Sequence, residues 1–97
     1  MKHNRNDTIK NIVTAVNEAK SKARAYKYIT SERYNYRRAL ATLEAYDQAL
    51  TLFVRGTEHE IPAMAVRAEM ALAVLDGRRD ALASVAEWMN TEERWTE

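Results

Sequence analysis

The sequence predicts an all-α protein, a small four-helix bundle made of a long antiparallel helical hairpin followed by a shorter one. Two observations carry this prediction. Apolar residues recur at steps of three and four along most of the chain, whereas the period-two alternation of strands never persists. Only two glycines and one proline occur in 97 residues, too few for the frequent turns of an all-β domain. A chain of this length forms one domain, in which we expect residues 1–6 and 91–97 to be flexible ends.

The long hairpin comes first. Its first helix is predicted from about Thr8 to Tyr28, after a capping residue at Asn6 or Asp7. Its second helix is predicted from about Glu32 to Val54. Residues 29–31 place a capping residue after two β-branched ones, which favours a break between the helices. One long, kinked helix is the alternative. The apolar face of the first helix is formed by Ile9, Ile12, Val13, Val16, Ala19, Ala23 and Tyr26.

The second helix is apolar on two sides. The larger side chains on one side are Tyr36, Ala39, Leu40, Leu43, Tyr46, Leu50, Phe53 and Val54. The opposite side carries Ala41, Ala45, Ala49 and Leu52, with Tyr34 on the same side. Such a helix either sits centrally in its own bundle or gives its second side to another chain. We therefore expect these three alanines and Leu52 to be a candidate oligomer face, and a homodimer rather than a monomer.

The shorter hairpin begins after Gly56, which is predicted to end the second helix. Pro62 suits the first position of a third helix. From Ala63 to Leu75 the chain is apolar nearly all round, so we expect this helix to be the most buried element.

Asp76 and Gly77 are predicted to form a turn. The fourth helix is then predicted from about Arg79 to Met89. Trp95 lies in the tail that follows, where it is expected to be either a lid on the bundle or an exposed anchor.

Charge is segregated along the chain, although the formal net charge is only +1. Residues 1–38 contain ten Lys and Arg against three Asp and Glu, whereas residues 39–97 contain five against eleven. A chain with this asymmetry can steer a charged partner to one end. The alternative is that the basic half packs beside the acidic half of the same chain.

Positive charge and aromatic rings concentrate between Lys20 and Arg38. This basic-aromatic stretch holds seven of the fifteen Lys and Arg and four of the five Tyr. Two basic rows are expected on helices, one of Lys20, Arg24 and Lys27 and one of Arg33 and Arg37. Like charges at such spacings repel by a few tenths of a kcal/mol per pair, which a nearby anion or acidic surface would offset.

The stretch suits an anionic partner. Arg matches carboxylate or phosphate with its planar fork, and Tyr offers rigid contact area to a protein or stacks on bases. The predicted partner-binding residues are Lys20, Arg24, Lys27, Arg33, Tyr34, Tyr36, Arg37 and Arg38.

No catalytic, metal or nucleotide motif accompanies this stretch. The chain has no cysteine, which excludes disulfides and thiolate chemistry, and it has no Gly-rich phosphate loop. His59 lies between Glu58 and Glu60, and three consecutive residues cannot all face one metal ion. We therefore expect no enzymatic activity, no cofactor and no metal. The longest apolar run, Met70–Leu75, is far short of the ~20 residues of a membrane span, so we expect a cytoplasmic protein without membrane contact.

In its proportions, short, cysteine-free, helical and without motifs, the chain resembles small accessory proteins of phages and other mobile elements. That resemblance implies action by occluding a host complex. We expect an inhibitor or modulator that docks its basic, Tyr-rich surface on an acidic or nucleic-acid-handling protein complex. Direct binding of nucleic acid or a nucleotide through the same residues is the alternative. The net charge of +1 and the lack of a helix-turn-helix pattern count against a dedicated DNA-binding domain.

Overall fold

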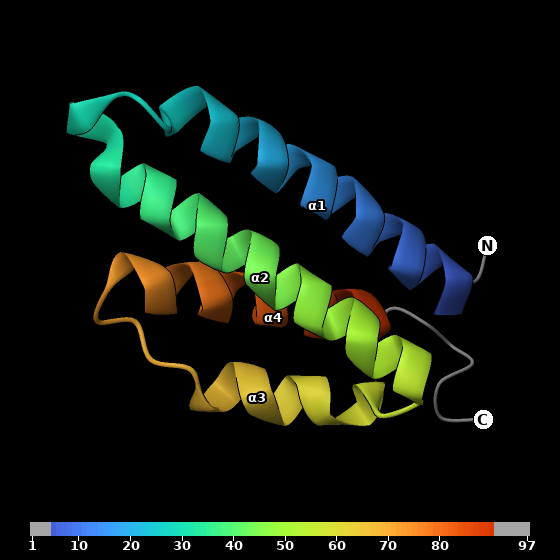
Figure 1. Cartoon of the computed structure of the whole chain (residues 1–97). Helices are drawn as coiled ribbons and strands as arrows, with labels where there is room; N and C mark the ends of the chain where they lie inside the picture. The colour runs from blue at the N-terminus through green and yellow to red at the C-terminus, as the bar shows by residue number, and fades with distance from the viewer. Residues whose placement is uncertain (1–4, 91–97) are drawn as a thin grey trace.

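The computed structural model describes residues 5–90 (Figure 1). Four α-helices follow one another along the chain: α1 (Arg5–Tyr26), α2 (Arg33–Arg55), α3 (Ile61–Arg67) and α4 (Ala73–Asn90). Two short 3-10 helices, η1 (Thr30–Glu32) and η2 (Glu58–Glu60), precede α2 and α3. The described residues contain no strand. The predicted all-α bundle is confirmed, with α1 and α2 as the longer hairpin and α3 and α4 as the shorter one (Figure 1).

α2 is the central helix of the bundle. It packs along both α1 and α4, whereas α1 and α4 touch only sparsely. Ala41, Ala45 and Ala49 are at most 5% exposed, and Leu52 packs half-buried against the core. The prediction that these residues form an oligomer face is wrong, because the chain already buries them. The small side chains instead let α4 approach α2, so the second apolar side of the helix serves its own bundle.

Gly77 lies at a close approach of α4 to α2. A Cβ atom on Gly77 would lie 2.4 Å from the carbonyl oxygen of Arg38 and 3.1 Å from Cβ of Ala41. Gly77 is buried within α4, which begins at Ala73. The predicted turn at Asp76 and Gly77, and the later start predicted for the fourth helix, are therefore wrong. Glycine provides space for a helix crossing here, and its backbone stays helical.

α3 is shorter and more exposed than the sequence predicts. It ends at Arg67, since Ala68 adopts an extended backbone with φ −70° and ψ 136°. Val66 is 85% exposed and Leu72, in the connection to α4, is 65% exposed. The predicted helix from Ala63 to Leu75, and its place as the most buried element, are wrong. Apolar content alone cannot separate two helices whose connection contains neither Gly nor Pro.

Three other predicted boundaries are confirmed. The break between α1 and α2 is confirmed, as residues 29–31 favoured, although α1 ends at Tyr26, two residues before the predicted end at Tyr28. Gly56 follows α2 with φ 75°, in the left-handed region, and its amide donates to the last carbonyls of that helix. Pro62 lies in the first turn of α3, where its missing amide hydrogen costs no helical hydrogen bond.

Arg5 ties the start of α1 to the end of α2. Its Nε lies 3.1 Å from the carboxylate of Glu58, whose side chain is only 12% exposed. The same guanidinium donates to the carbonyl of Phe53 and lies 5.5 Å from the centroid of its ring. Residues 5 and 6 therefore belong to the helix and not to a flexible end. Residues 1–4 and the predicted flexible end at 91–97, with Trp95, lie outside the described residues.

The core lies where α1, α2, α3 and α4 converge. Its most completely buried large apolar side chains are Ile12, Phe53, Ile61, Leu82 and Val85. Tyr46 of α2 stacks on Trp88 of α4, with ring centroids 6.0 Å apart and an interplanar angle of 13°. None of the described helices is long and apolar enough to span a bilayer.

Candidate functional site

The link between α1 and α2 forms a tight corner at one end of the bundle (Figure 1). The Ile29 amide donates a hydrogen bond to the carbonyl of Tyr26, the last residue of α1, at 3.1 Å. The Glu32 amide then donates to the carbonyl of Ile29 at 3.0 Å, which closes η1 ahead of α2. These bonds shape residues 26–36, which we call the corner.

The corner surrounds a hollow of about 190 Å³. Tyr26 and Tyr36, both half-buried, line it from α1 and α2, and Lys27 and Arg33 line it with cationic side chains. No acidic side chain among the described residues lines this hollow. With Tyr28, which also lines the hollow, the arrangement offers two cations and three phenols to an anionic group that enters from outside.

Three large apolar or aromatic side chains of the corner are exposed: Tyr28, Ile29 and Tyr34. Tyr28 is 86% exposed and Ile29 is 49% exposed. The ammonium of Lys27 lies 5.3 Å from the centroid of the Tyr28 ring, within range of a cation–π interaction. The corner thus combines exposed apolar area with positive charge, and aromatic residues are enriched in protein interfaces.

The charges predicted on the two helices are exposed. Arg33 and Arg37 lie one turn apart on α2, and Lys20 and Arg24 lie one turn apart on α1. None of these four forms an ion pair with another described residue. Lys27 lies in the turn after α1 and belongs to the corner. The predicted row of Lys20, Arg24 and Lys27 on one helix is therefore wrong, and only Lys20 and Arg24 share a helix.

Arg38 and Tyr34 are already engaged within the chain. Arg38 forms a salt bridge with Asp80 of α4, and the Tyr34 hydroxyl donates to the carboxylate of Asp76. That hydrogen bond, which holds the phenol protonated, raises the pKa of Tyr34 above its ordinary value, and the negative charge of Asp76 adds to the effect. For these two residues the basic half does pack beside the acidic half, which leaves them less available to a partner.

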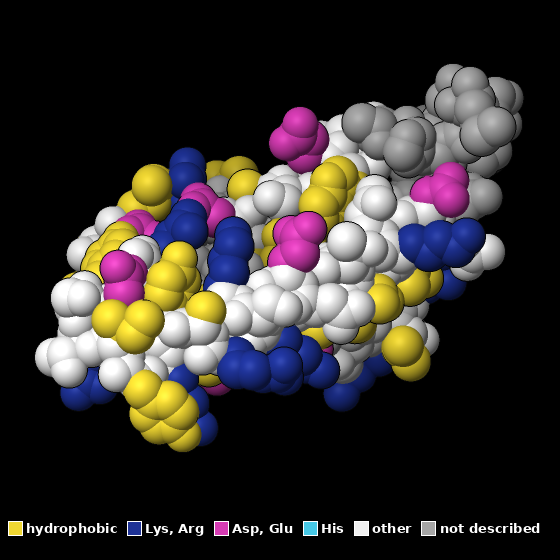
Figure 2. All heavy atoms as spheres, turned by 90° about the horizontal axis from the view of Figure 1, so that it is seen from above, with side chains coloured by type: hydrophobic (Ala, Val, Ile, Leu, Met, Phe, Trp, Pro, Cys, Tyr) yellow, Lys and Arg dark blue, Asp and Glu magenta, His cyan; other side chains and the backbone are white. Residues whose placement is uncertain are grey.

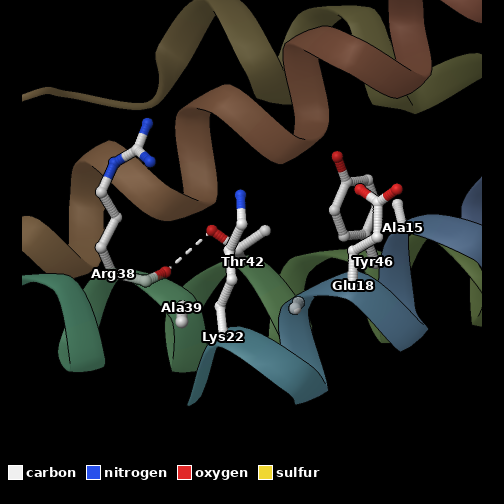
Figure 3. A pocket seen from close by; sticks show the side chains of 8 residues that line it. Ala15, Glu18, Lys22, Arg38, Ala39, Thr42 and Tyr46 are labelled. Carbon is white, nitrogen blue, oxygen red and sulfur yellow. Dashed lines mark hydrogen bonds between the residues drawn. The ribbon is translucent and has the colours of Figure 1, made fainter. Parts of the chain in front are cut away.

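A second hollow, of about 120 Å³, lies between α1 and α2 beside α4 (Figure 3). Glu18 and Lys22 line it from α1, and Arg38, Thr42 and Tyr46 from α2. The Thr42 hydroxyl donates to the carbonyl of Arg38 at 2.8 Å, and the guanidinium of Arg38 extends toward α4 (Figure 3). The lining mixes both signs of charge and contains no nucleophile next to a base, so it indicates no particular ligand.

The connection between α3 and α4 lies at the same end of the bundle as the corner (Figure 1), and it contains exposed apolar residues. Met70 is 55% exposed and Leu72 is 65% exposed. Seen from above, basic, acidic and apolar side chains interleave over this end (Figure 2). Sequence reasoning missed both residues as surface groups, because they belong to an apolar run that looks the same whether it is core or surface.

No group of three or more described acidic or histidine residues is placed to hold a metal ion. His59 is exposed, and its neighbour Glu58 is bound to Arg5. No protein-family model, curated protein or solved structure matches this chain.

Proposed function

We propose that this chain is a non-enzymatic interaction protein that binds an acidic segment of a partner protein at its corner. The observation that carries the proposal is the hollow lined by Lys27 and Arg33, which has no acidic residue of the described chain in its lining. Two cations held beside a concave, tyrosine-lined surface suit a carboxylate that arrives from another molecule.

The partner's carboxylate is expected to enter the hollow and to accept hydrogen bonds from Arg33, with the Lys27 ammonium nearby. Charge-assisted hydrogen bonds of this kind are shorter and stronger than neutral ones. Tyr28 and Ile29, which stand at 86% and 49% exposure, would cover apolar groups next to that carboxylate. Arg and Tyr anchors flanked by apolar contacts are typical of residues that dominate binding energy.

A protein fits this surface better than a phosphate backbone does. Asp76 accepts from Tyr34 and Asp80 pairs with Arg38, so these two residues of the basic-aromatic stretch are not free to contact a run of phosphates. Exposed Ile29 and Leu72 offer contact area to apolar side chains but nothing to a sugar-phosphate chain.

Direct binding of nucleic acid is the second candidate, and one observation favours it. The Tyr28 ring is nearly free of protein contacts at 86% exposure and has a lysine beside it, which is a workable platform for a stacked base. This candidate requires affinity that falls steeply with salt, because bound phosphates release counterions.

Such a protein would act by occupancy. By covering an acidic docking site on a protein complex, it would inhibit or modulate that complex without chemistry of its own. The expected mode of action is the one predicted from the sequence. The expected binding residues are now those of the corner, and no longer the whole basic-aromatic stretch.

Affinity purification with mass spectrometry, carried out with and without nuclease, identifies the partner and separates a protein from a nucleic-acid bridge. Binding of the purified partner is then measured for Arg33→Ala and Lys27→Ala. We expect each change to weaken binding by about tenfold or more, since a hydrogen bond to a charged group contributes about 1.5–3 kcal/mol.

Arg55→Ala and Lys10→Ala are matched controls, because both residues are exposed cations outside the corner. They should bind like the unchanged protein. Equal losses from corner and control variants would reduce the effect to net charge, and wild-type binding by both corner variants would refute the proposal.

A further inference from the structure

The outer side of α3 and α4 carries an apolar groove of about 540 Å³. Pro62 and Val66 of α3 and Ala83 and Ala86 of α4 line it. Val66 is 85% exposed, so a large apolar side chain stands at this groove without covering. Ala65, at the base of the groove, belongs to the core, whereas Val66 and Ala83 are exposed.

The two ends of the groove carry opposite charges. Arg79 and Glu87 both line it, each one helical turn from Ala83 along α4, on opposite sides of that residue. Arg79 lies 3.5 Å from Asp80, but its side chain remains 40% exposed. Glu87 is exposed and forms no ion pair with another described residue.

We infer that a second copy of this chain occupies the groove, in a dimer whose two-fold axis passes close to Ala83. In a symmetric interface of this kind a residue i contacts j on the partner while j contacts i. Two α4 helices laid antiparallel about Ala83 bring Arg79 of each protomer to Glu87 of its partner, twice in one dimer. Each Val66 then covers the small alanines of the facing groove.

The surface is complementary to itself, and that points to a second copy as its occupant. Its charges are balanced about a central alanine, whereas an unrelated partner would have to match both ends separately. A stable interface removes about 800 Å² from each partner, which is about an eighth of the 6473 Å² exposed by this chain. The antiparallel arrangement also places the two corners at opposite ends of the dimer, so the inference does not depend on the proposed function.

The test is sedimentation equilibrium of the full chain over a range of micromolar concentrations, with helix content checked by circular dichroism. We expect a dimer for the unchanged protein. Arg79→Glu and Glu87→Arg should each raise the dimer dissociation constant by about tenfold or more, because each creates two like-charged pairs. The double variant Arg79→Glu/Glu87→Arg should restore the dimer, since the pairs re-form with their signs exchanged.

Val66→Asp should give a folded monomer, and Glu44→Arg, a charge reversal on the exposed surface of α2, should leave the dimer intact. A monomer at every concentration would overturn the inference. It would equally fail if the double variant were weaker than either single one, because the two charges would then not meet across the interface. The charge-exchange variant keeps the test valid even where Val66→Asp fails to fold.

Discussion

Arg33 and Arg38 belong to the same basic-aromatic stretch but lie in two regions with different roles. Arg38 faces α4, where Asp80 neutralises it, where Tyr34 is bound to Asp76 and where Gly77 lets the backbones meet. Arg33 lies at the corner, on a hollow with no described acidic lining. In the first region, charge and small residues hold the fold together. In the second, neither Arg33 nor Lys27 forms an ion pair with another described residue.

The difference separates the cations that the fold pairs with acidic residues from those that it leaves exposed. Arg33 and Arg37 lie one turn apart without a counter-ion in the described chain, an arrangement that destabilises a helix slightly. The pairs Arg38–Asp80 and Tyr34–Asp76 stabilise the contact between α2 and α4. This contact accounts for the presence of Arg38 and Tyr34. Arg33 and Arg37 have no such ion pair within the described chain, and the anionic partner proposed above would offset their repulsion.

Gly77→Ala should have the largest effect on stability. Alanine in a helix interior is normally better than glycine by about 1 kcal/mol. Here the added methyl would lie 2.4 Å from the backbone oxygen of Arg38, which cannot move without shifting α2. We expect the free energy of unfolding to fall by about 2 kcal/mol, as for other overpacked sites, measured by urea denaturation.

Gly56→Ala provides the matched control, because a Cβ there would meet no atom within 4 Å. Its cost should be about 1 kcal/mol and come only from the positive φ of 75°. Two outcomes would contradict the role given to the α2–α4 crossing: a Gly77→Ala protein more stable than the original, or one that loses less stability than Gly56→Ala.

Local sequence signals predicted the elements but not their crossings. The break at residues 29–31, Gly56 and Pro62 could be predicted because each reflects local backbone preferences. An Asp-Gly pair looks the same in sequence whether it forms a turn or lies inside a helix. At Gly77 glycine is needed because α2, a distant part of the chain, packs closely against it. The alanines of α2 were ambiguous for the same reason, since either α4 or another chain could cover them.

The sequence predicts which kinds of residue form the candidate site, but it predicts only part of how they are placed in the fold. Exposed Arg33 and Arg37 follow from their spacing on a helix. The pairing of Arg38 with Asp80 joins residues 42 positions apart, and no local pattern contains that information. Lys27 and Tyr28 were placed in a helix, and their position in the turn is what brings a cation onto an exposed ring.

Replacing Arg38, at the α2–α4 contact, and Arg33, at the corner, compares the two regions directly. The expected changes in the free energy of unfolding are smaller than for Gly77→Ala. Arg38→Ala should lower the free energy of unfolding by about 0.5–1 kcal/mol, the usual range for a partly exposed ion pair. Arg33→Ala should change it by less than about 0.5 kcal/mol, as is typical of surface sites, or raise it slightly by relieving repulsion from Arg37. Asp80→Ala and the double variant Arg38→Ala/Asp80→Ala complete a cycle that isolates the pair. If Arg33→Ala cost as much as Arg38→Ala, the two regions would not differ as proposed.

The smallest effect concerns alkaline pH and the side of α2 that faces α4. Burial is the main cause that raises the pKa of Tyr46 above its ordinary value, and a hydrogen bond with Ser84 opposes the shift. An unfolded tyrosine loses its proton near pH 10, whereas the folded protein keeps it to higher pH. The stability that Tyr46 contributes is therefore complete below about pH 10 and is lost as pH rises through the folded pKa. Urea denaturation at a series of alkaline pH values should show a decline that is shallower in Tyr46→Phe than in the original protein. Identical curves for Tyr46→Phe and the original protein would mean that Tyr46 titrates in the folded chain as it does in the unfolded one.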